Sequence, residues 1–444
     1  MRLALLVAVA AALVCTSTPL LAEWGVEIAG QPLSLDDCIA IALARSPSIS
    51  LAQEQVRSSE AGLRRSAASY YPGVLFIGTR GRTGGTSFLD TPAGTVPFSI
   101  ATDRREAEVI LTHTIWQTGR GEAVRGSRYA LAVSTARQTA IRQDVAVSVS
   151  QLYYAALAAE QLVAVAEANL AAARQHEELV RARSEVGESP PVDVVFAEAD
   201  VAQAEFSVLQ SENEAALAKA RLKREIGLAP TYQLQLAGPE GSAIERAAPS
   251  LDDALAIAAG HRPELAAAEA SVRAAEEQLR SAKLLEWGQM SLSAEYDQGV
   301  TGPKADADSW AIVGILTAFL FDGGSRSADV DAARAQVGSA KAQQQQTLDA
   351  VGLEVEIALL ELETARKSIE AADRAVAGAE AQLAAAQSKY REGVGIFVEI
   401  LDAERAVVRA RTDLIRTSFD YATADVAVRK ATGSLVLPGG AGLT

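Results

Sequence analysis

The sequence predicts a mainly helical fold in which one structural unit occurs twice, together with a smaller share of β-strand suited to a membrane. Three observations support this prediction. Two long segments repeat each other in register. Each repeat contains a long helical stretch that is broken once by glycine, and each contains a pair of segments with β-strand alternation. The expected fold class is therefore mainly α with membrane β, built from long antiparallel helical hairpins and four strands per chain.

The internal repeat is clearest at two helix starts and two glycines. The motif SLDD begins at Ser34 and again at Ser250, a shift of 216 residues (34 to 250). Beyond the strand segments the shift becomes 206 residues (187 to 393), which aligns Gly187 with Gly393. A register that persists over most of both halves and changes once indicates two copies of one unit. The first copy has the longer loop between its strands.

The repeat defines the expected organisation of the chain. Residues 1–22 have the basic start, short apolar core and small final residue of a secretory signal peptide. A membrane anchor and a lipidated Cys15 are the alternatives for this segment. The remaining boundaries are a first repeat at 23–228, a linker at 229–249, a second repeat at 250–434 and a tail at 435–444.

Charge, cysteine content and the absence of catalytic motifs exclude several classes of protein. The formal net charge of −15 argues against a nucleic-acid partner. Without the signal segment Cys38 is the one cysteine, so neither an intrachain disulfide nor a cysteine metal cluster is expected. His113, His176 and His261 lack ligand spacing, and each is expected to be a lone surface or strand residue. No catalytic constellation or phosphate loop emerges, so we expect neither an enzyme nor a cofactor.

Each repeat begins with helices and continues into a strand pair. Pro47 and Pro263 end or kink a short first helix, and a second helix follows. The strand pairs are expected at 74–116, with a polar glycine-rich loop from about 83 to 102, and at 289–321. Residues 290–297 alternate between apolar and polar side chains. Strands of about ten residues suit a tilted bilayer crossing, with ordinary hairpins on a soluble core as the alternative.

A long helix and a return helix follow each strand pair. No proline occurs from 121 to 186, which predicts a rod on the order of 100 Å long. The first hairpin is expected to turn near 187–191, at Gly187. The second is expected to turn near 393–395, at Gly393 and Gly395. Both turns are thus predicted tips of antiparallel helical hairpins.

Four membrane strands cannot close a barrel by themselves, and an open edge leaves backbone groups unpaired in lipid. Closed barrels have about eight strands or more. Two chains would supply eight strands and three would supply twelve. Three chains fit the helices better, because twelve long helices around one axis would enclose a wide tunnel.

These features resemble the TolC-type outer-membrane factors, the exit ducts of tripartite efflux pumps and type I secretion systems. The resemblance covers nearly all of the mature chain. It rests on the duplication, the glycine-terminated strand pairs, the turn from Phe321 to Gly324 and the second tip from Tyr390 to Asp402. It implies a homotrimer with a 12-stranded β-barrel in the outer membrane of a Gram-negative-type cell and a helical barrel in the periplasm. Outer-membrane lipid, a periplasmic adaptor and an inner-membrane pump are the implied partners.

The resemblance also implies a constriction at the second tip. Glu399 and Asp402 match acids that line the narrow inner mouth, where rings of carboxylates favour cations. Acids stabilised by the start of a helix are the alternative. Tyr390 and Asp193 match a tyrosine and its acidic partner that hold the mouth shut, but the family's basic residue falls on Gly395. The sequence thus leaves open how the tip is locked, and it does not encode the exported substrate.

Two other classes remain as alternatives. A surface or periplasmic structural coiled-coil protein would have long helices, but it would not need strand pairs at matched places in both halves. A periplasmic adaptor would carry one helical hairpin flanked by lipoyl-like β domains, whereas this chain has two duplicated hairpins. The exit duct is therefore the preferred hypothesis.

Overall fold

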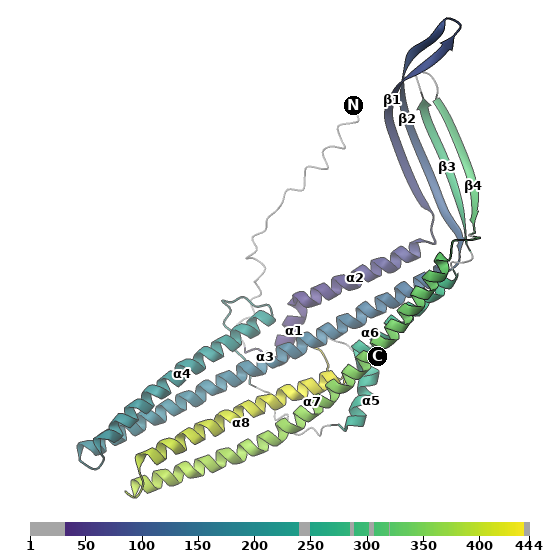
Figure 1. Ribbon diagram of the computed structural model, residues 1–444. Helices are drawn as coiled ribbons and strands as arrows, with labels where there is room; N and C mark the ends of the chain where they lie inside the picture. Colours follow the sequence, from purple (N-terminus) through teal and green to yellow (C-terminus); the bar gives the residue numbers. More distant parts are fainter. Residues whose placement is uncertain (1–31, 239–248, 285–287, 302–305, 319, 439–444) are drawn as a thin grey trace. The chain divides into compact units, whose positions relative to one another are not determined.

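The computed structural model describes residues 32–238, 249–284, 288–301, 306–318 and 320–438 (Figure 1). The expected signal peptide at 1–22 lies outside these residues. In chain order the elements are α1 Leu35–Arg45, α2 Pro47–Ala68, β1 Gly73–Thr91, β2 Gly94–Gln117, α3 Arg120–Glu185, α4 Pro191–Glu225, α5 Leu251–His261, α6 Pro263–Leu284, β3 Gln289–Thr301, β4 Asp306–Thr317, α7 Ser325–Arg391 and α8 Phe397–Ala431. The order of elements in the first half recurs in the second, as the fold class predicted.

The starts of the two repeats use the same local chemistry. The Oγ atoms of Ser34 and Ser250 each accept a hydrogen bond, at 3.2 Å, from the backbone N–H three residues later. This contact caps α1 and α5 by satisfying one of the free N–H groups at the helix start. Pro47 and Pro263 then open α2 and α6. Proline is favourable at a first helical position because its missing N–H would have had no partner there.

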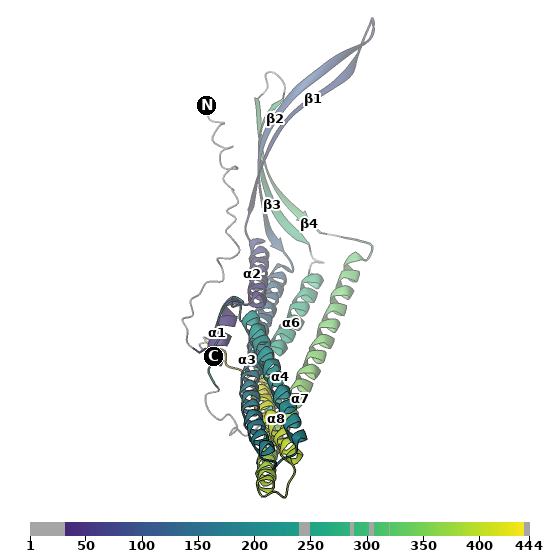
Figure 2. The same cartoon turned by 90° about the vertical axis from the view of Figure 1, so that its left-hand side faces the viewer.

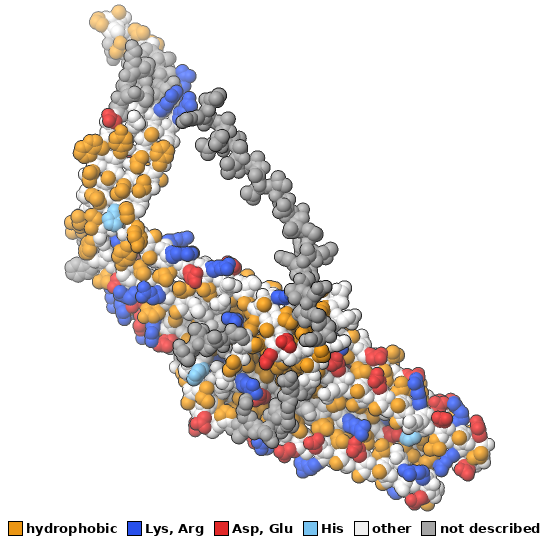
Figure 3. Space-filling view, turned by 180° about the vertical axis from the view of Figure 1, so that it is seen from behind, with side chains coloured by type: hydrophobic (Ala, Val, Ile, Leu, Met, Phe, Trp, Pro, Cys, Tyr) orange, Lys and Arg blue, Asp and Glu red, His pale blue; other side chains and the backbone are white. Residues whose placement is uncertain are grey.

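The four strands form one antiparallel sheet in the order β1-β2-β3-β4. One face carries apolar side chains, as the row of hydrogen-bonded neighbours across all four strands illustrates: Phe76, Val109, Tyr296 and Trp310. The adjacent row faces the other side and carries acids on the two central strands: Ile77, Glu108, Asp297 and Ser309. Hydrophobic side chains gather over the sheet in Figure 3. The alternation expected for residues 290–297 is confirmed.

The glycine-rich loop expected at about 83–102 is wrong. These residues continue β1 and β2, which pair without interruption to the Thr91–Gly94 turn. Glycine, serine and threonine weakened the apolar alternation there, but a ladder needs only backbone N–H and C=O groups. Gly94, with a φ of 118°, accommodates the tight turn. In the second pair β4 ends at Thr317, so the strand pair stops short of the expected residue 321.

The chain divides into two compact units, and each unit draws on both repeats. One unit contains the sheet and comprises residues 48–141 and 255–355. The other comprises residues up to 47, 142–254 and 356–444, and it contains both hairpin tips. We refer to the latter as the tip unit. Within it α4, α8 and the adjoining parts of α3 and α7 run side by side (Figures 1 and 2).

The helices of the tip unit pack mainly through alanine and valine. Buried side chains of this kind recur along α3, including Ala146, Val149 and Ala156. Tyr153 lies among them, and its hydroxyl donates a 2.6 Å hydrogen bond to the carbonyl of Ala237. The described part of the expected linker is thereby fastened to α3. Small side chains allow the close helix spacing that buries this surface.

Among the described residues, α3 has the one helical stretch that is apolar and long enough to cross a membrane by length and composition. One such helix is weak evidence for a membrane span. Of its most apolar window, 17% is buried in the described structure, and α3 continues to the first hairpin turn at Gly187. We therefore assign α3 to the helical hairpin.

Candidate functional site

The two hairpin tips turn through the same backbone motif. In the first tip the N–H of Glu188 donates to the carbonyl of Arg183 at 2.9 Å, around Gly187 with a φ of 77°. In the second the N–H of Val394 donates to the carbonyl of Lys389 at 3.0 Å, around Gly393 with a φ of 75°. Glycine adopts this left-handed conformation without steric cost, so it ends both long helices.

Gly395 is constrained by space. A side chain there would bring its Cβ within 3.1 Å of the Tyr390 backbone nitrogen and 3.2 Å of the Lys389 carbonyl carbon. The N–H of Gly395 also donates to the Lys389 carbonyl at 3.1 Å, which holds the turn against the end of α7. The turn of this chain therefore has little room for the basic residue that the TolC-type resemblance places at this position.

Tyr390 is enclosed by residues of both hairpins. It is 8% exposed, and its ring centre lies 5.9 Å from that of Phe397, the first residue of α8. The guanidinium carbon of Arg183, near the end of α3, lies 5.0 Å from the centre of the Tyr390 ring. This is a cation–π distance. A basic group thus does contact the tip tyrosine, but it comes from the first hairpin.

The predicted site residues occupy different environments. Glu399 and Asp402 are exposed near the start of α8, and Asp402 has a side chain 68% exposed and 3.7 Å from Arg405. Asp193 is partly buried in the first turn of α4, where its carboxylate accepts a 2.9 Å hydrogen bond from Ser189 Oγ. Among the described residues, the ring of Tyr390 lies against Arg183 and Phe397, whereas the hydrogen bond described for the Asp193 carboxylate is the one from Ser189.

A hydrophobic cluster joins the two hairpins behind the tips. Its buried members come from α3, α4, α7 and α8: Val180, Ala197, Ala386, Tyr390, Phe397, Ile400, Leu401 and Ala403. Ile400 and Leu401 lie between Glu399 and Asp402 in sequence. The same turn of α8 therefore buries its apolar side against the first hairpin and leaves both acids in solvent.

Sequence reasoning missed a polar cluster next to this core. His176 was expected to be a lone surface or strand residue, and this expectation is wrong. Its side chain is 18% exposed, and Nδ1 lies 2.9 Å from Oε1 of Glu404, which is 10% exposed. Asp200 of α4 lies beside them and is paired with Arg405 at 3.4 Å. The available signal was the position of Glu404 within the apolar pattern of α8, between Ala403 and Val407.

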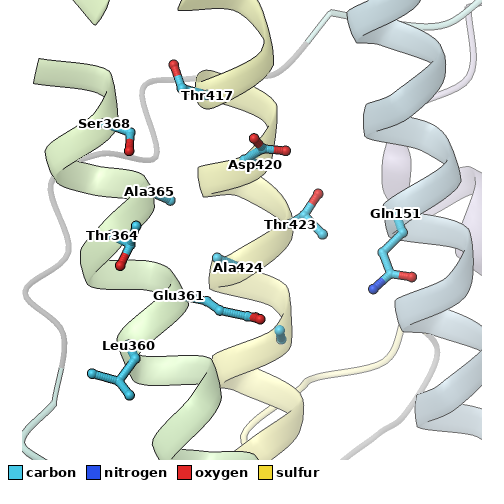
Figure 4. A pocket seen from close by; sticks show the side chains of 11 residues that line it. Gln151, Leu360, Glu361, Thr364, Ala365, Ser368, Thr417, Asp420, Thr423 and Ala424 are labelled. Atoms are coloured by element: carbon cyan, nitrogen blue, oxygen red, sulfur yellow. The ribbon is translucent and has the colours of Figure 1, made fainter. Parts of the chain in front are cut away.

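In the described part of the tip unit, two of the cavities open between its helices. The larger, about 490 Å³, lies between α7 and α8 with Gln151 of α3 opposite, and polar side chains such as Glu361 and Asp420 line it (Figure 4). The smaller, about 220 Å³, is bordered by α3, α7 and α8 and includes Glu404. Among the described residues there is no group of three metal-ligating side chains.

Long paired helices and a four-stranded sheet with one apolar face are the features expected of an outer-membrane channel built from helical hairpins. The chain belongs to the outer membrane efflux protein family, whose profile matches residues 38–228 and 254–434. It is an outer-membrane efflux channel protein that extends into the periplasm of a Gram-negative cell, and neither the adaptor nor the coiled-coil alternative is favoured.

Individual proteins show the same relationship. The chain is 28% identical over 411 residues to Protein CyaE of Bordetella pertussis, covering 91% of this chain and 84% of that protein. The outer membrane protein VceC of Vibrio cholerae has a similar fold, with a TM-score of 0.73 at 20% identity, covering 90% of this chain and 96% of VceC. The open state of the Neisseria gonorrhoeae MtrE outer membrane channel gives a TM-score of 0.72 at 19% identity, with coverages of 90% and 88%.

Proposed function

We propose that three copies of this chain assemble into one duct that serves an inner-membrane pump through a periplasmic adaptor. The four strands of each chain would contribute to a 12-stranded barrel, which removes the open sheet edges that lipid does not tolerate. The apolar row from Phe76 to Trp310 supports an outward lipid-facing side for the sheet. We expect the chain to act by conduction and to have no catalytic activity.

We further propose that the second hairpin tip is the gate. The observation that carries this proposal is the first turns of α8, which have exposed Glu399 and Asp402 on one side and a core shared with the first hairpin on the other. Around a threefold axis the two positions would form two rings of carboxylates. Such rings attract cations and repel anions. We assign Tyr390 and Asp193 to the same gate, since Tyr390 packs against Arg183 of the first hairpin and Phe397 of the second, and Asp193 lies in the first turn of α4.

Conductance of the purified protein in a planar lipid bilayer tests both proposals. The unmodified protein is expected to form trimers that conduct ions with a preference for cations. The double variant Glu399→Gln, Asp402→Asn is expected to lose much of this preference, because it removes both rings. The matched control is Glu185→Gln, Glu188→Gln, which removes two exposed acids from the first tip.

The possible results separate the two proposals. A protein that stays monomeric or never conducts would refute the duct. Conducting trimers whose cation preference is unchanged in the Glu399 and Asp402 double variant would refute the gate assignment only. An equal loss of cation preference in the control variant would show that both tips contribute to selectivity, which contradicts the assignment of the gate to the second tip.

A further inference from the structure

The ion pair between His176 and Glu404 connects the two hairpins of one chain. His176 belongs to α3 of the first hairpin and Glu404 to α8 of the second. Both side chains are mostly buried, and 2.9 Å separates Nδ1 from Oε1. The pair combines this short contact with charge attraction between the imidazolium and the carboxylate. That attraction exists only while the imidazole is protonated.

The groups around His176 are mainly acidic. The negative charge of Asp200, on α4, raises the pKa of His176. Arg405 of α8 is in turn ion-paired with Asp200. From α7, Gln387 and Glu380 border the adjoining cavity, and Glu380 is ion-paired with Arg411. On α3 itself Glu177 is ion-paired with Arg181. His176 is therefore the group whose protonation decides the local charge balance near neutral pH.

The charge balance differs between the two protonation states. With His176 protonated, the cationic His176 and Arg405 match the anionic Glu404 and Asp200. With His176 neutral, one negative charge remains without compensation in a mostly buried setting, which is unfavourable. Pairing with Glu404 raises the pKa of His176 despite the opposing effect of burial. Burial raises the pKa of Asp200 as well. This shift also makes the packed hairpins more stable at lower pH.

A chain of aromatic contacts connects this ion pair to the tip. The ring of His176 meets that of Phe397 edge to face, with centres 6.4 Å apart and planes at 81°. Phe397 in turn packs on Tyr390, and it begins the helix that carries Glu399 and Asp402. Loss of the contact between His176 and α8 would therefore act directly on the residues of the proposed gate.

We propose that His176 and Glu404 form a proton-sensitive clamp that holds the first hairpin against the second and favours the closed tip under mildly acidic conditions. The inference rests on the proposed gate. Because the pKa of His176 is raised in the folded state, its contribution is complete below the ordinary value of 6.5. The contribution is lost as the pH rises through the raised value, so the tip opens more readily at neutral and alkaline pH.

Conductance measured from about pH 5.5 to about pH 8.5, a range that brackets ordinary imidazole titration, tests the clamp. The unmodified trimer is expected to conduct about fivefold more at the upper end, a factor typical of weakly coupled sites. His176→Gln and the isosteric Glu404→Gln are each expected to conduct at the higher level throughout. His261→Gln is the matched control, because His261 is exposed and its described hydrogen bond is to the Ile257 carbonyl of its own helix.

A second measurement does not depend on conduction. The thermal unfolding midpoint of the unmodified trimer is expected to fall as the pH rises through the raised His176 pKa, and this part of the pH dependence is expected to vanish in His176→Gln. A conducting trimer with no pH dependence, or an unchanged dependence in His176→Gln, would overturn the clamp. A trimer that never conducts would instead overturn the proposed channel.

Discussion

The guanidinium carbon of Arg183 lies 5.0 Å from the centre of the Tyr390 ring, so a basic residue of the first hairpin covers the aromatic residue of the second. The two residues are far apart in sequence and meet only because the hairpins pack side by side. The contact provides a basic group at the tip although position 395 is a glycine. Its position suggests that the closed tip is held by contact between hairpins as well as by the turn itself.

Replacing Arg183 by alanine is expected to weaken the closed tip. Cation–π contacts at partly exposed sites contribute about 0.5–1 kcal/mol, which corresponds to roughly a two- to fivefold shift toward open channels. Single-channel recordings of open probability measure this shift. Arg181→Ala is the control, since Arg181 is bonded to Glu177 and Glu198 within the first hairpin. Equal effects of the two substitutions would contradict a specific role for Arg183.

Two substitutions at Tyr390 separate ring packing from hydrogen bonding. Tyr390→Phe is expected to stay closed, because the ring keeps its contacts with Phe397 and Arg183. Tyr390→Ala is expected to lose about 3–5 kcal/mol of stability, as truncation of a buried aromatic ring does, and to open the tip. Conductance and thermal unfolding report the two effects. If Tyr390→Phe opened the channel as far as Tyr390→Ala, the hydroxyl and its predicted partner Asp193 would be the essential contact instead.

Alanine at Gly395 is expected to destabilise the second tip by about 1 kcal/mol or more, because the added Cβ would crowd the backbone of Lys389 and Tyr390. Gly378→Ala is expected to raise stability instead. Gly378 lies within α7, where an added Cβ meets open space and alanine improves helix propensity by up to about 1 kcal/mol. Thermal unfolding of the two variants measures the difference. A tolerated Gly395→Ala would show that the turn can relax to accept a side chain.

Charge on the apolar face of the sheet is expected to prevent stable insertion. Ile312 is 65% exposed near the middle of β4, on the same face as Trp310. Ile312→Arg is therefore expected to reduce insertion, because arginine at a lipid-facing midplane position costs about 2–4 kcal/mol. Ala311→Arg places the same charge on the opposite face and is the matched control. The amount of trimer recovered from outer membranes reports insertion, and equal recovery of both variants would place the lipid elsewhere.

Local patterns in the sequence were sufficient to predict the helices and where they begin and end. Serine caps, prolines at first helical positions and glycines with positive φ act within a few residues, so they can be recognised without the fold. Reliance on local composition also explains why a loop was wrongly expected at 83–102. The composition there favours a loop, but backbone pairing between β1 and β2 makes these residues strands.

The sequence by itself therefore determined the duplication, the two hairpins and their glycine turns, and the exposed acids Glu399 and Asp402. Only the tertiary structure decided that Arg183 covers Tyr390 and that His176 is paired with Glu404. Helical periodicity predicts which face of a helix is apolar, but it does not specify which residue of another helix lies opposite. That choice depends on how the two hairpins are aligned along their length. The alignment is set by the shared core behind the tips, and no single segment of the chain contains that information.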